Sequence, residues 1–360
     1  MKYCFFIIIL TINILCIRKK ELFTSDIKSQ FEQFDIDNKK NYPLVTLGYI
    51  TPWNKEGYDY VKKYSKKFDI ISPTWFELKP EEIDGEFQII LDGSNNVDSS
   101  FMKDLKNKNK KILILPRLHV GFTEQKMFNI WFTKESEQFV KVLERRIKYN
   151  KFDGYVFDCM RIWYDTNILN KFTRYLLPKI SELMKKLNKK FILTVIPVHK
   201  KNMNYQNDKD ILKKLKNYVD YFNIMTYDYD QYDNDNNKFY SSPISWIKET
   251  IDFYAGKDDD ILKKILFGVP FHGYVYNKKS GKPTDVINSK QFLQLLNKGE
   301  FETNFDENEC EYSISDDKII INFPNINYIG KRLELSKELN IGGCGIWDIG
   351  NGKEGLLEPL

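Results

Sequence analysis

The stretch "KFDGYVFDCMRIW", residues 151–163, decides the fold because it combines a strand pattern with an unexpected carboxylate. Successive side chains of a strand point to opposite faces, so Val156, Asp158 and Met160 share one face. Their neighbours are apolar or aromatic, which is typical of a strand that is buried on both faces. A single carboxylate therefore lies between two apolar side chains. The pattern indicates either an ordinary buried strand or the remnant of an active site.

Short apolar runs of this kind recur along the chain and alternate with charged segments of helical spacing. They lie at residues 44–50, 68–76, 87–93 or 111–118, 152–160, 191–198, 221–228, 265–273 and 342–350. Continuous apolar strands separated by helices are typical of a parallel sheet that is covered on its faces. Eight such strands, with no glycine-rich nucleotide loop after the first, predict an α/β fold of the (β/α)8 TIM-barrel type.

The intervals between these strands complete the predicted organisation. Residues 136–150, 174–188 and 243–254 have the apolar spacing of helices. The longest interval lies before the last strand and contains a predicted hairpin at 310–323, so we expect a small α+β insertion at about 275–335, between strands 7 and 8. Residues 228–240 are predicted to form a polar loop. Residues 43–360 would then form one barrel domain with this insertion.

The N-terminus predicts entry into the secretory pathway. One lysine precedes 14 residues that are mostly apolar, from Cys4 to Ile17, and three basic residues follow. This run is too short to cross about 30 Å of hydrocarbon, which predicts a signal peptide over residues 1–17 rather than a stable membrane span. Residues 18–42 are predicted to form a polar linker. The protein would reach the cell exterior or the lumen of the endoplasmic reticulum or an endolysosomal compartment.

Composition narrows the class of partner. The 360 residues are 42 % hydrophobic and carry a net charge of +5, with basic residues scattered along the chain. The scatter argues against nucleic acid as the main partner. Three cysteines remain after the leader, Cys159, Cys310 and Cys344, so at most one disulfide is expected and no metal spacing is present. We predict no metal and no cofactor.

Aromatic residues outnumber charged residues where the predicted strands end. In a (β/α)8 barrel the functional site lies at the C-terminal ends of the strands. The candidate ligand-binding residues there are Tyr49, Trp53, Trp75, Arg117, Asp158, Met160, Tyr227, Asp228 and Trp347. A groove of aromatic rings with a few carboxylates suits sugars, whose C–H faces lie on aromatic surfaces while their hydroxyls find polar partners.

Five of these segments resemble a known family. In chain order they are "GYITPW", "FDGYVFDCM", "IMTYD", "GVPFHGY" and "GGCGIWDIG". Together they resemble the family 18 glycoside hydrolases, which include chitinases and chitinase-like lectins, and most closely the chitinase-domain-containing proteins. The resemblance covers about residues 44–355. It implies a barrel that binds amino-sugar oligomers. It also implies that Trp347 corresponds to the tryptophan that lies beneath the central sugar in this family.

The same resemblance implies that catalysis is lost. Active members carry D-G-x-D-x-D-x-E on the fourth strand, where Glu protonates the glycosidic oxygen and the middle Asp holds the 2-acetamido group whose carbonyl attacks the anomeric carbon. Here Asp153 and Asp158 match, Val156 replaces the middle Asp, and Met160 replaces the Glu. A thioether donates no proton. The family's third-strand S-x-G-G is also replaced, by "LPRLHVG", which brings Arg117 toward the site.

Several single residues keep two interpretations. Asp158 is either a buried structural carboxylate or a ligand contact. Arg117 is an ion-pair partner of Asp158 or Asp228, or a ligand clamp. The three histidines, His119, His199 and His272, are expected to be structural.

Three functions remain open from the sequence. The leading hypothesis is a catalytically inactive, chitinase-like protein that binds chitin, chitooligosaccharides or related glycans. The first alternative is an active glycosidase with a relocated acid, for which the candidates are Asp158, Asp165, Asp228 and Asp230. The second is a secretory-pathway interaction protein that uses the barrel as a scaffold.

Overall fold

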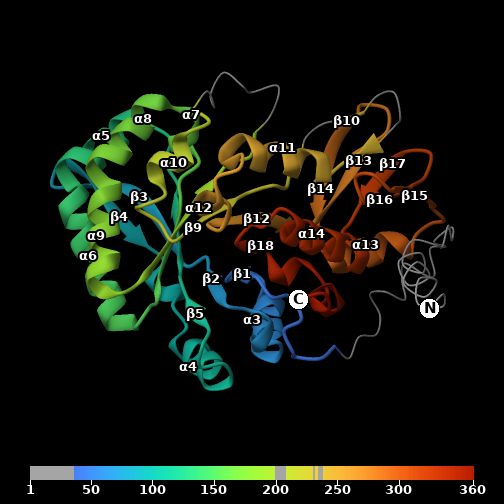
Figure 1. The fold of residues 1–360 in the computed structure, drawn as a ribbon, viewed down its shortest axis with the longest axis horizontal. Coiled ribbons are helices and arrows are strands. Elements are labelled where there is room, and N and C mark those ends of the chain that lie inside the picture. Colours follow the sequence, from blue (N-terminus) through green and yellow to red (C-terminus); the bar gives the residue numbers. More distant parts are fainter. Residues whose placement is uncertain (1–35, 199–207, 230–231, 234–237) are drawn as a thin grey trace, which may run out of the picture.

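A parallel β-barrel surrounded by helices dominates the computed structural model, which describes residues 36–198, 208–229, 232–233 and 238–360 (Figure 1). The barrel strands are β1 (Val45–Ile50), β2 (Ile70–Pro73), β3 (Phe76–Ile83), β5 (Leu113–Ile114), β6 (Arg117–Val120), β7 (Gly154–Asp158), β8 (Lys190–Val195), β9 (Tyr221–Ile224), β12 (Ile265–Pro270) and β18 (Gly343–Trp347). Each pairs in parallel with its neighbours, and β18 pairs with both β12 and β1. The predicted α/β barrel is therefore confirmed.

The second and third strand positions are each broken into two pieces. β2 continues as β3 after residues 74–75, and β5 continues as β6 after residues 115–116; β2 pairs with β5, and β3 pairs with β6. Residues 111–118 thus supply the third strand. The other candidate forms β4 (Glu86–Asp92), which turns back antiparallel on β3. The turn is Asp84-Gly85, both with positive φ, a dipeptide strongly favoured in two-residue hairpins.

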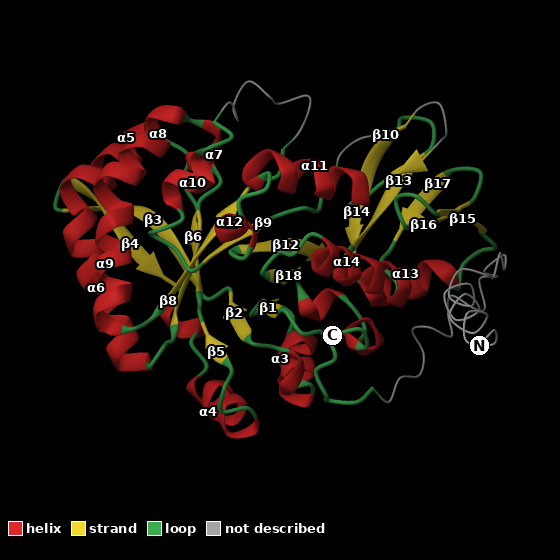
Figure 2. Cartoon of the chain, in the orientation of Figure 1, coloured by secondary structure: helices red, strands yellow, loops and turns green. Residues whose placement is uncertain are grey.

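Helices cover the outside of the barrel (Figure 2). They are α3 (Lys55–Lys63), α4 (Ser99–Lys108), α5 (Gln125–Asn129), α6 (Ser136–Asn150), α7 (Arg161–Tyr164), α8 (Thr166–Lys171), α9 (Leu177–Leu187), α10 (Ile211–Leu215), α11 (Ile244–Ala255), α12 (Asp259–Leu262) and α14 (Ile326–Glu338). The three predicted helices correspond to α6, α9 and α11. The second begins later than predicted because a π-helical turn, η4 (Phe172–Leu176), precedes it.

An antiparallel sheet interrupts the barrel between β12 and β18 and stands beside it (Figure 1). It consists of β13 (Gly273–Asn277), β14 (Lys282–Ile287), β15 (Glu302–Asp306), β16 (Glu311–Ser315) and β17 (Ile319–Asn322), with helix α13 (Ser289–Leu296). The predicted hairpin at 310–323 is β16 paired with β17. A short ladder of β10 (Tyr232–Asp233) and β11 (Lys238–Phe239) lies in the segment predicted as a polar loop. The predicted insertion between strands 7 and 8 is thus present.

Strand alternation separates two apolar layers. Seven buried side chains fill the barrel interior: Leu47, Tyr49, Ile70, Leu115, Val156, Ile192 and Leu266. Tyr155 and Phe157, the intervening residues of β7, lie in the larger layer between strands and helices. The inward face of β7 is therefore the face that carries Val156 and Asp158, as the period of two predicts.

Aspartates secure the N-terminal ends of the strands. Asp69, Asp153 and Asp220 each precede a strand and accept a backbone N–H near the start of a neighbouring strand. Asp153 accepts the N–H of Ile114 at 2.9 Å and pairs with Lys106 at 2.7 Å. Asp153, the first residue of the motif, is thus a structural residue at the barrel end away from the strands' C-termini.

Residues 36–42 pack on the barrel, although the sequence predicts a polar linker there. Tyr42 is 2 % exposed, and its hydroxyl lies 2.7 Å from that of Ser336. The barrel domain therefore begins before residue 43. The predicted signal peptide lies outside the described residues, within which no helix is long and apolar enough to span a membrane. All three described cysteines are buried and free, so no disulfide joins them.

Candidate functional site

The C-terminal ends of the barrel strands bring most of the predicted site residues together. Tyr49 comes from β1, Arg117 from β6, Asp158 from β7 and Trp347 from β18, while Tyr227 follows β9. The parallel strands of such a barrel end at one mouth, so segments far apart in the sequence meet there.

Asp158 is buried at this mouth and bonded through both carboxylate oxygens. Arg117 donates Nε–H to Oδ2 at 2.7 Å and also donates from Nη2, and the Thr194 hydroxyl donates to Oδ1 at 2.7 Å. Burial alone would raise the pKa of Asp158, but the Arg117 charge and the bonds from His119 and Thr194 outweigh it and hold the pKa well below its usual range. The carboxylate is thus ionised, and each of its two oxygens accepts a hydrogen bond from another side chain.

Arg117 lies between Asp158 and Trp347. Its Cζ is 5.0 Å from the centroid of the Trp347 ring, within the range of a cation–π contact. Tyr49 packs against the same indole edge-to-face at 5.4 Å and donates its hydroxyl to Asn223 Oδ1 at 2.7 Å. Of the two carboxylates that the sequence left open as partners of Arg117, the structure selects Asp158.

Asp228 lies on the side of the mouth that faces the inserted sheet. His272 Nε2 is 2.9 Å from Asp228 Oδ1, and the Tyr274 hydroxyl on β13 donates to the same oxygen. Partial desolvation raises the pKa of Asp228, but these two partners outweigh it, so the pKa is lowered. The residue adopts a φ of +63°, a left-handed conformation that Asp tolerates better than most residues. The insertion thus helps to orient a barrel residue.

Tyr227 packs closely on β12. A Cβ atom at Gly268 would lie 2.7 Å from two of its ring atoms, so only glycine leaves room for the ring. Tyr227 is 9 % exposed and meets His272 edge-to-face at 6.1 Å.

Two of the predicted site residues are apolar and exposed. Trp53, after β1, is 73 % exposed, and Met160, two residues beyond β7, is 42 % exposed. Val156 is fully buried in the barrel interior, below Asp158 on the same strand face. The position of the expected acid is therefore an open, apolar one.

The prediction that Trp75 binds ligand is wrong. Trp75 is 1 % exposed, packs on Phe152, and donates its indole N–H to the Tyr58 hydroxyl at 2.8 Å. It belongs to the layer between strands and helices. Counting alternate residues from inward-facing Ile70 places position 75 on the outer face.

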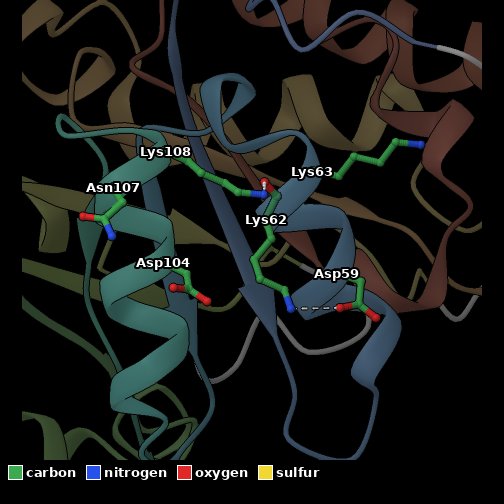
Figure 3. Close-up of a pocket in the computed structure, with 6 residues that line it drawn as sticks. All are labelled: Asp59, Lys62, Lys63, Asp104, Asn107 and Lys108. Atoms are coloured by element: carbon green, nitrogen blue, oxygen red, sulfur yellow. Dashed lines mark hydrogen bonds and ion pairs between the residues drawn. The ribbon is translucent and has the colours of Figure 1, made fainter.

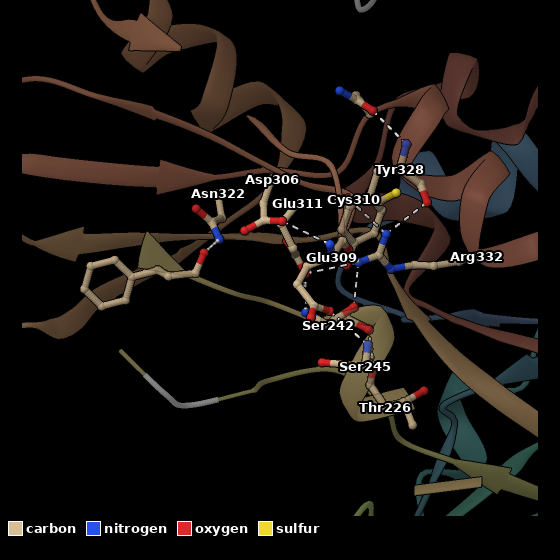
Figure 4. Close-up of polar contacts among 12 residues, drawn as sticks. Thr226, Ser242, Ser245, Asp306, Glu309, Cys310, Glu311, Asn322, Tyr328 and Arg332 are labelled. Carbon is tan, nitrogen blue, oxygen red and sulfur yellow. Dashed lines mark hydrogen bonds and ion pairs between the residues drawn. The ribbon is translucent and has the colours of Figure 1, made fainter. Parts of the chain in front are cut away.

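A buried contact between an arginine and a carboxyl group joins the insertion to the barrel (Figure 4). Arg332 on α14 and Glu311 on β16 are 3.1 Å apart, and both side chains are almost fully buried. Glu311 accepts the Ser242 N–H at 2.7 Å, Arg332 donates to the Ser242 carbonyl, and the Ser242 hydroxyl donates to the Thr226 carbonyl. Thr226 directly precedes Tyr227 and Asp228, so the insertion supports the loop that carries them.

A separate polar groove of about 540 Å³ lies in the helical layer (Figure 3). Its lining comes only from α3 and α4: Asp59, Lys62, Lys63, Asp104, Asn107 and Lys108. Lys62 and Asp59 pair at 3.1 Å. This groove contains none of the predicted site residues. Within the part of the chain that the structure describes, no group of three or more His, Cys, Asp or Glu side chains is placed to hold a metal ion.

Comparison with known proteins identifies the family. The model for glycosyl hydrolases family 18 matches residues 45–352. The chain belongs to glycosyl hydrolase family 18. Its place near the chitinase-domain-containing proteins stays a prediction.

Several solved structures share this fold. The chitinase from Chromobacterium violaceum superposes with a TM-score of 0.71 at 16 % identity, over 87 % of this chain and 96 % of that one. The chitinase from Cycas revoluta in complex with (GlcNAc)3 gives 0.69 at 15 % identity, over 87 % and 97 %. YKL-39, solved in the presence of chitooligosaccharides, gives 0.71 at 14 % identity, over 88 % and 98 %.

Several residues that complete this family 18 site were not predicted from the sequence. Thr194 follows inward-facing Ile192 by two positions on β8, so strand period alone would have placed it beside Asp158. The same period places Asn223 on the inward face of β9, two positions after Tyr221. Tyr274 gave no such signal. The expected structural histidines bear on the site as well: His119 Nδ1 lies 3.2 Å from Arg117 Nη2, and His272 contacts Asp228. His199 lies outside the described residues.

Proposed function

We propose that this protein is a catalytically inactive family 18 member that binds oligosaccharides built from N-acetylglucosamine. One observation carries the proposal: β7 leads to Met160 where an acid is required, while the one remaining inward carboxylate, Asp158, is held by Arg117. The binding site would be the mouth of the barrel.

The loss of catalysis follows from proton chemistry. General acid catalysis contributes about 10²–10⁴ in rate and needs a group that holds a proton near working pH. Met160 has no proton to give. Asp158 and Asp228 both have lowered pKa values, the opposite of what an acid requires.

The remaining carboxylates do not restore the acid. Asp165 accepts the first N–H groups of α8 and pairs with Arg161, so it serves as a helix cap. Burial raises the pKa of Asp348 to about 6, but this carboxyl is 3 % exposed and bonded to Asn351. Asp230 lies outside the described residues. These observations count against the alternative of an active glycosidase.

The exposed apolar side chains at the strand ends support sugar as the ligand. Trp53 follows β1 and Met160 follows β7, both are exposed, and such surfaces pack against the C–H faces of sugar rings. Two structural relatives are described with N-acetylglucosamine oligomers. This shared chemistry supports chitooligosaccharides as the first ligands to test.

Calorimetric titration with N-acetylglucosamine oligomers of increasing length tests the proposal. We expect saturable binding without release of shorter products, and weaker binding by Trp53→Ala. Tyr149→Ala is the matched control, because Tyr149 is 85 % exposed but lies at the end of α6 that leads into the start of β7. A folded protein that binds no oligomer would reject the proposal and leave the interaction-scaffold alternative.

The proposal includes entry into the secretory pathway, which rests on the predicted leader. Expression of the full chain in a eukaryotic cell with a C-terminal tag tests this part. We expect removal of about 17 residues and recovery of the product in the lumen or the medium, and an intact N-terminus on a cytosolic product would contradict it.

A further inference from the structure

At the mouth of the barrel, one ion pair lies where active relatives carry several acidic side chains. The motif of active relatives places three acidic side chains at the inward positions of this strand, whereas here they are Val156, Asp158 and Met160. Arg117 is the register neighbour of Val156 on the adjacent strand β6. The guanidinium therefore reaches Asp158 from a place beside the lost carboxylate.

This ion pair fixes the guanidinium over the indole of Trp347. Three N–H groups of Arg117 are directed at Asp158 and His119, which leaves its orientation little freedom. Flat groups that pack on an aromatic ring have centres about 4.5–7 Å from its centroid. The Arg117 Cζ lies at 5.0 Å, inside that range. A sugar ring stacked on this side of Trp347 would need the space that Arg117 occupies.

Moving Arg117 aside is unfavourable. The Asp158 side chain is 2 % exposed, so a departing guanidinium would leave a carboxylate buried without its counter-charge. A ligand at Trp347 must therefore compete with a buried ion pair. The exposed Trp53 offers an aromatic surface that needs no such rearrangement.

We propose that Arg117 closes the central position of the groove, so that oligosaccharides bind this protein through positions outside Trp347. Arg117 is then the residue that decides which part of the groove is open. The inference rests on the proposed function because it specifies where on the barrel mouth the sugar lies.

The test compares two double variants that both remove the charge pair. Arg117→Ala with Asp158→Asn empties the space over Trp347, whereas Arg117→Met with Asp158→Asn keeps it filled by an uncharged chain of similar length. Neither leaves a buried unpaired charge, and urea unfolding verifies that both fold. Chitotriose and chitohexaose are titrated into each variant and the wild type. Fluorescence is recorded with and without Trp347→Phe, to identify the signal of Trp347.

We expect the emptied variant to bind chitotriose at least about tenfold more tightly than the filled variant and the wild type. Its fluorescence change should vanish with Trp347→Phe, while the wild-type change should not depend on Trp347. Equal affinities in the two double variants, or weaker binding by the emptied one than by wild type, would overturn the inference and make Arg117 a bystander or a ligand contact. If wild type binds nothing but the emptied variant binds, the proposed function fails and the closure stands.

Discussion

Glu311→Gln isolates a buried carboxyl group that links the inserted sheet to the barrel. Its carboxylate accepts the Ser242 N–H and the Arg332 guanidinium, and glutamine retains an oxygen that can accept both. Burial raises the pKa of Glu311 to about 7, because the Arg332 charge and the backbone bonds compensate only part of the lost hydration. The substitution removes the titration while keeping the shape.

The sign of the pH effect follows from proton binding. The folded state holds the Glu311 proton up to about pH 7, whereas the unfolded chain releases it near its ordinary value of 4.5. The folded state therefore binds more protons in this window, and the free energy of unfolding falls as the pH rises through it. A shift of this size corresponds to about 3 kcal/mol. Asp348 contributes the same sign at lower pH in both proteins, so the difference between them reports Glu311 alone.

Urea unfolding at intervals from pH 4.5 to 8 measures this difference. The two proteins should have nearly equal stability at pH 4.5, and Glu311→Gln should be the more stable by about 3 kcal/mol at pH 8. Parallel profiles, or a wild type that gains stability relative to the variant as the pH rises, would refute the assignment of a protonated Glu311.

Three further substitutions test the barrel and its mouth. Thr194→Val removes the hydroxyl donor to Asp158 and should cost about 1–3 kcal/mol in urea unfolding, because a buried acceptor loses a partner. Gly154→Ala should cost about 3 kcal/mol or more, since φ is +147° and a Cβ would lie 1.8 Å from a backbone carbonyl oxygen. Gly330→Ala is its control, with no atom within 4 Å, and should be neutral or stabilising. Met160→Glu should hydrolyse no fluorogenic chitobioside, because Asp158 stays bound to Arg117.

Each of these expectations has a contrary result. An unchanged midpoint for Thr194→Val would mean that water replaces the hydroxyl. Equal stabilities of the two alanine variants would contradict the close approach at Gly154. Turnover by Met160→Glu would show that the arginine does not prevent Asp158 from serving catalysis.

The fold could be predicted from the sequence because the patterns that indicate it are local and repeated. The period of two around Val156 and Asp158 identified the inward face of β7, and the alternation of apolar runs with helical segments predicted the barrel. The breaks in strands 2 and 3 could not be predicted from the sequence, because the continuity of a strand depends on its pairing with neighbouring strands. The Asp84-Gly85 dipeptide is a local signal for the β3–β4 hairpin, whereas the apolar pattern alone made residues 87–93 a candidate barrel strand.

The site could be predicted only in part, because the contacts that define it join strands that are distant in the sequence. Arg117 had two candidate partners in the sequence, and strand register decided for Asp158. Trp75 lies next to a strand end, which predicted a place at the mouth, but its parity along the strand puts its side chain on the outer face. The Glu311–Arg332 pair had no sequence signal, because 21 residues separate its members and each looks like an ordinary surface charge.

The most direct test of the central claim is one calorimetric titration of the purified protein with chitohexaose, followed by mass analysis of the sugar. We predict saturable heat of binding and chitohexaose recovered intact. The appearance of shorter oligomers, or the absence of any binding by a folded protein, would contradict the conclusion that this family 18 barrel binds sugar without cleaving it.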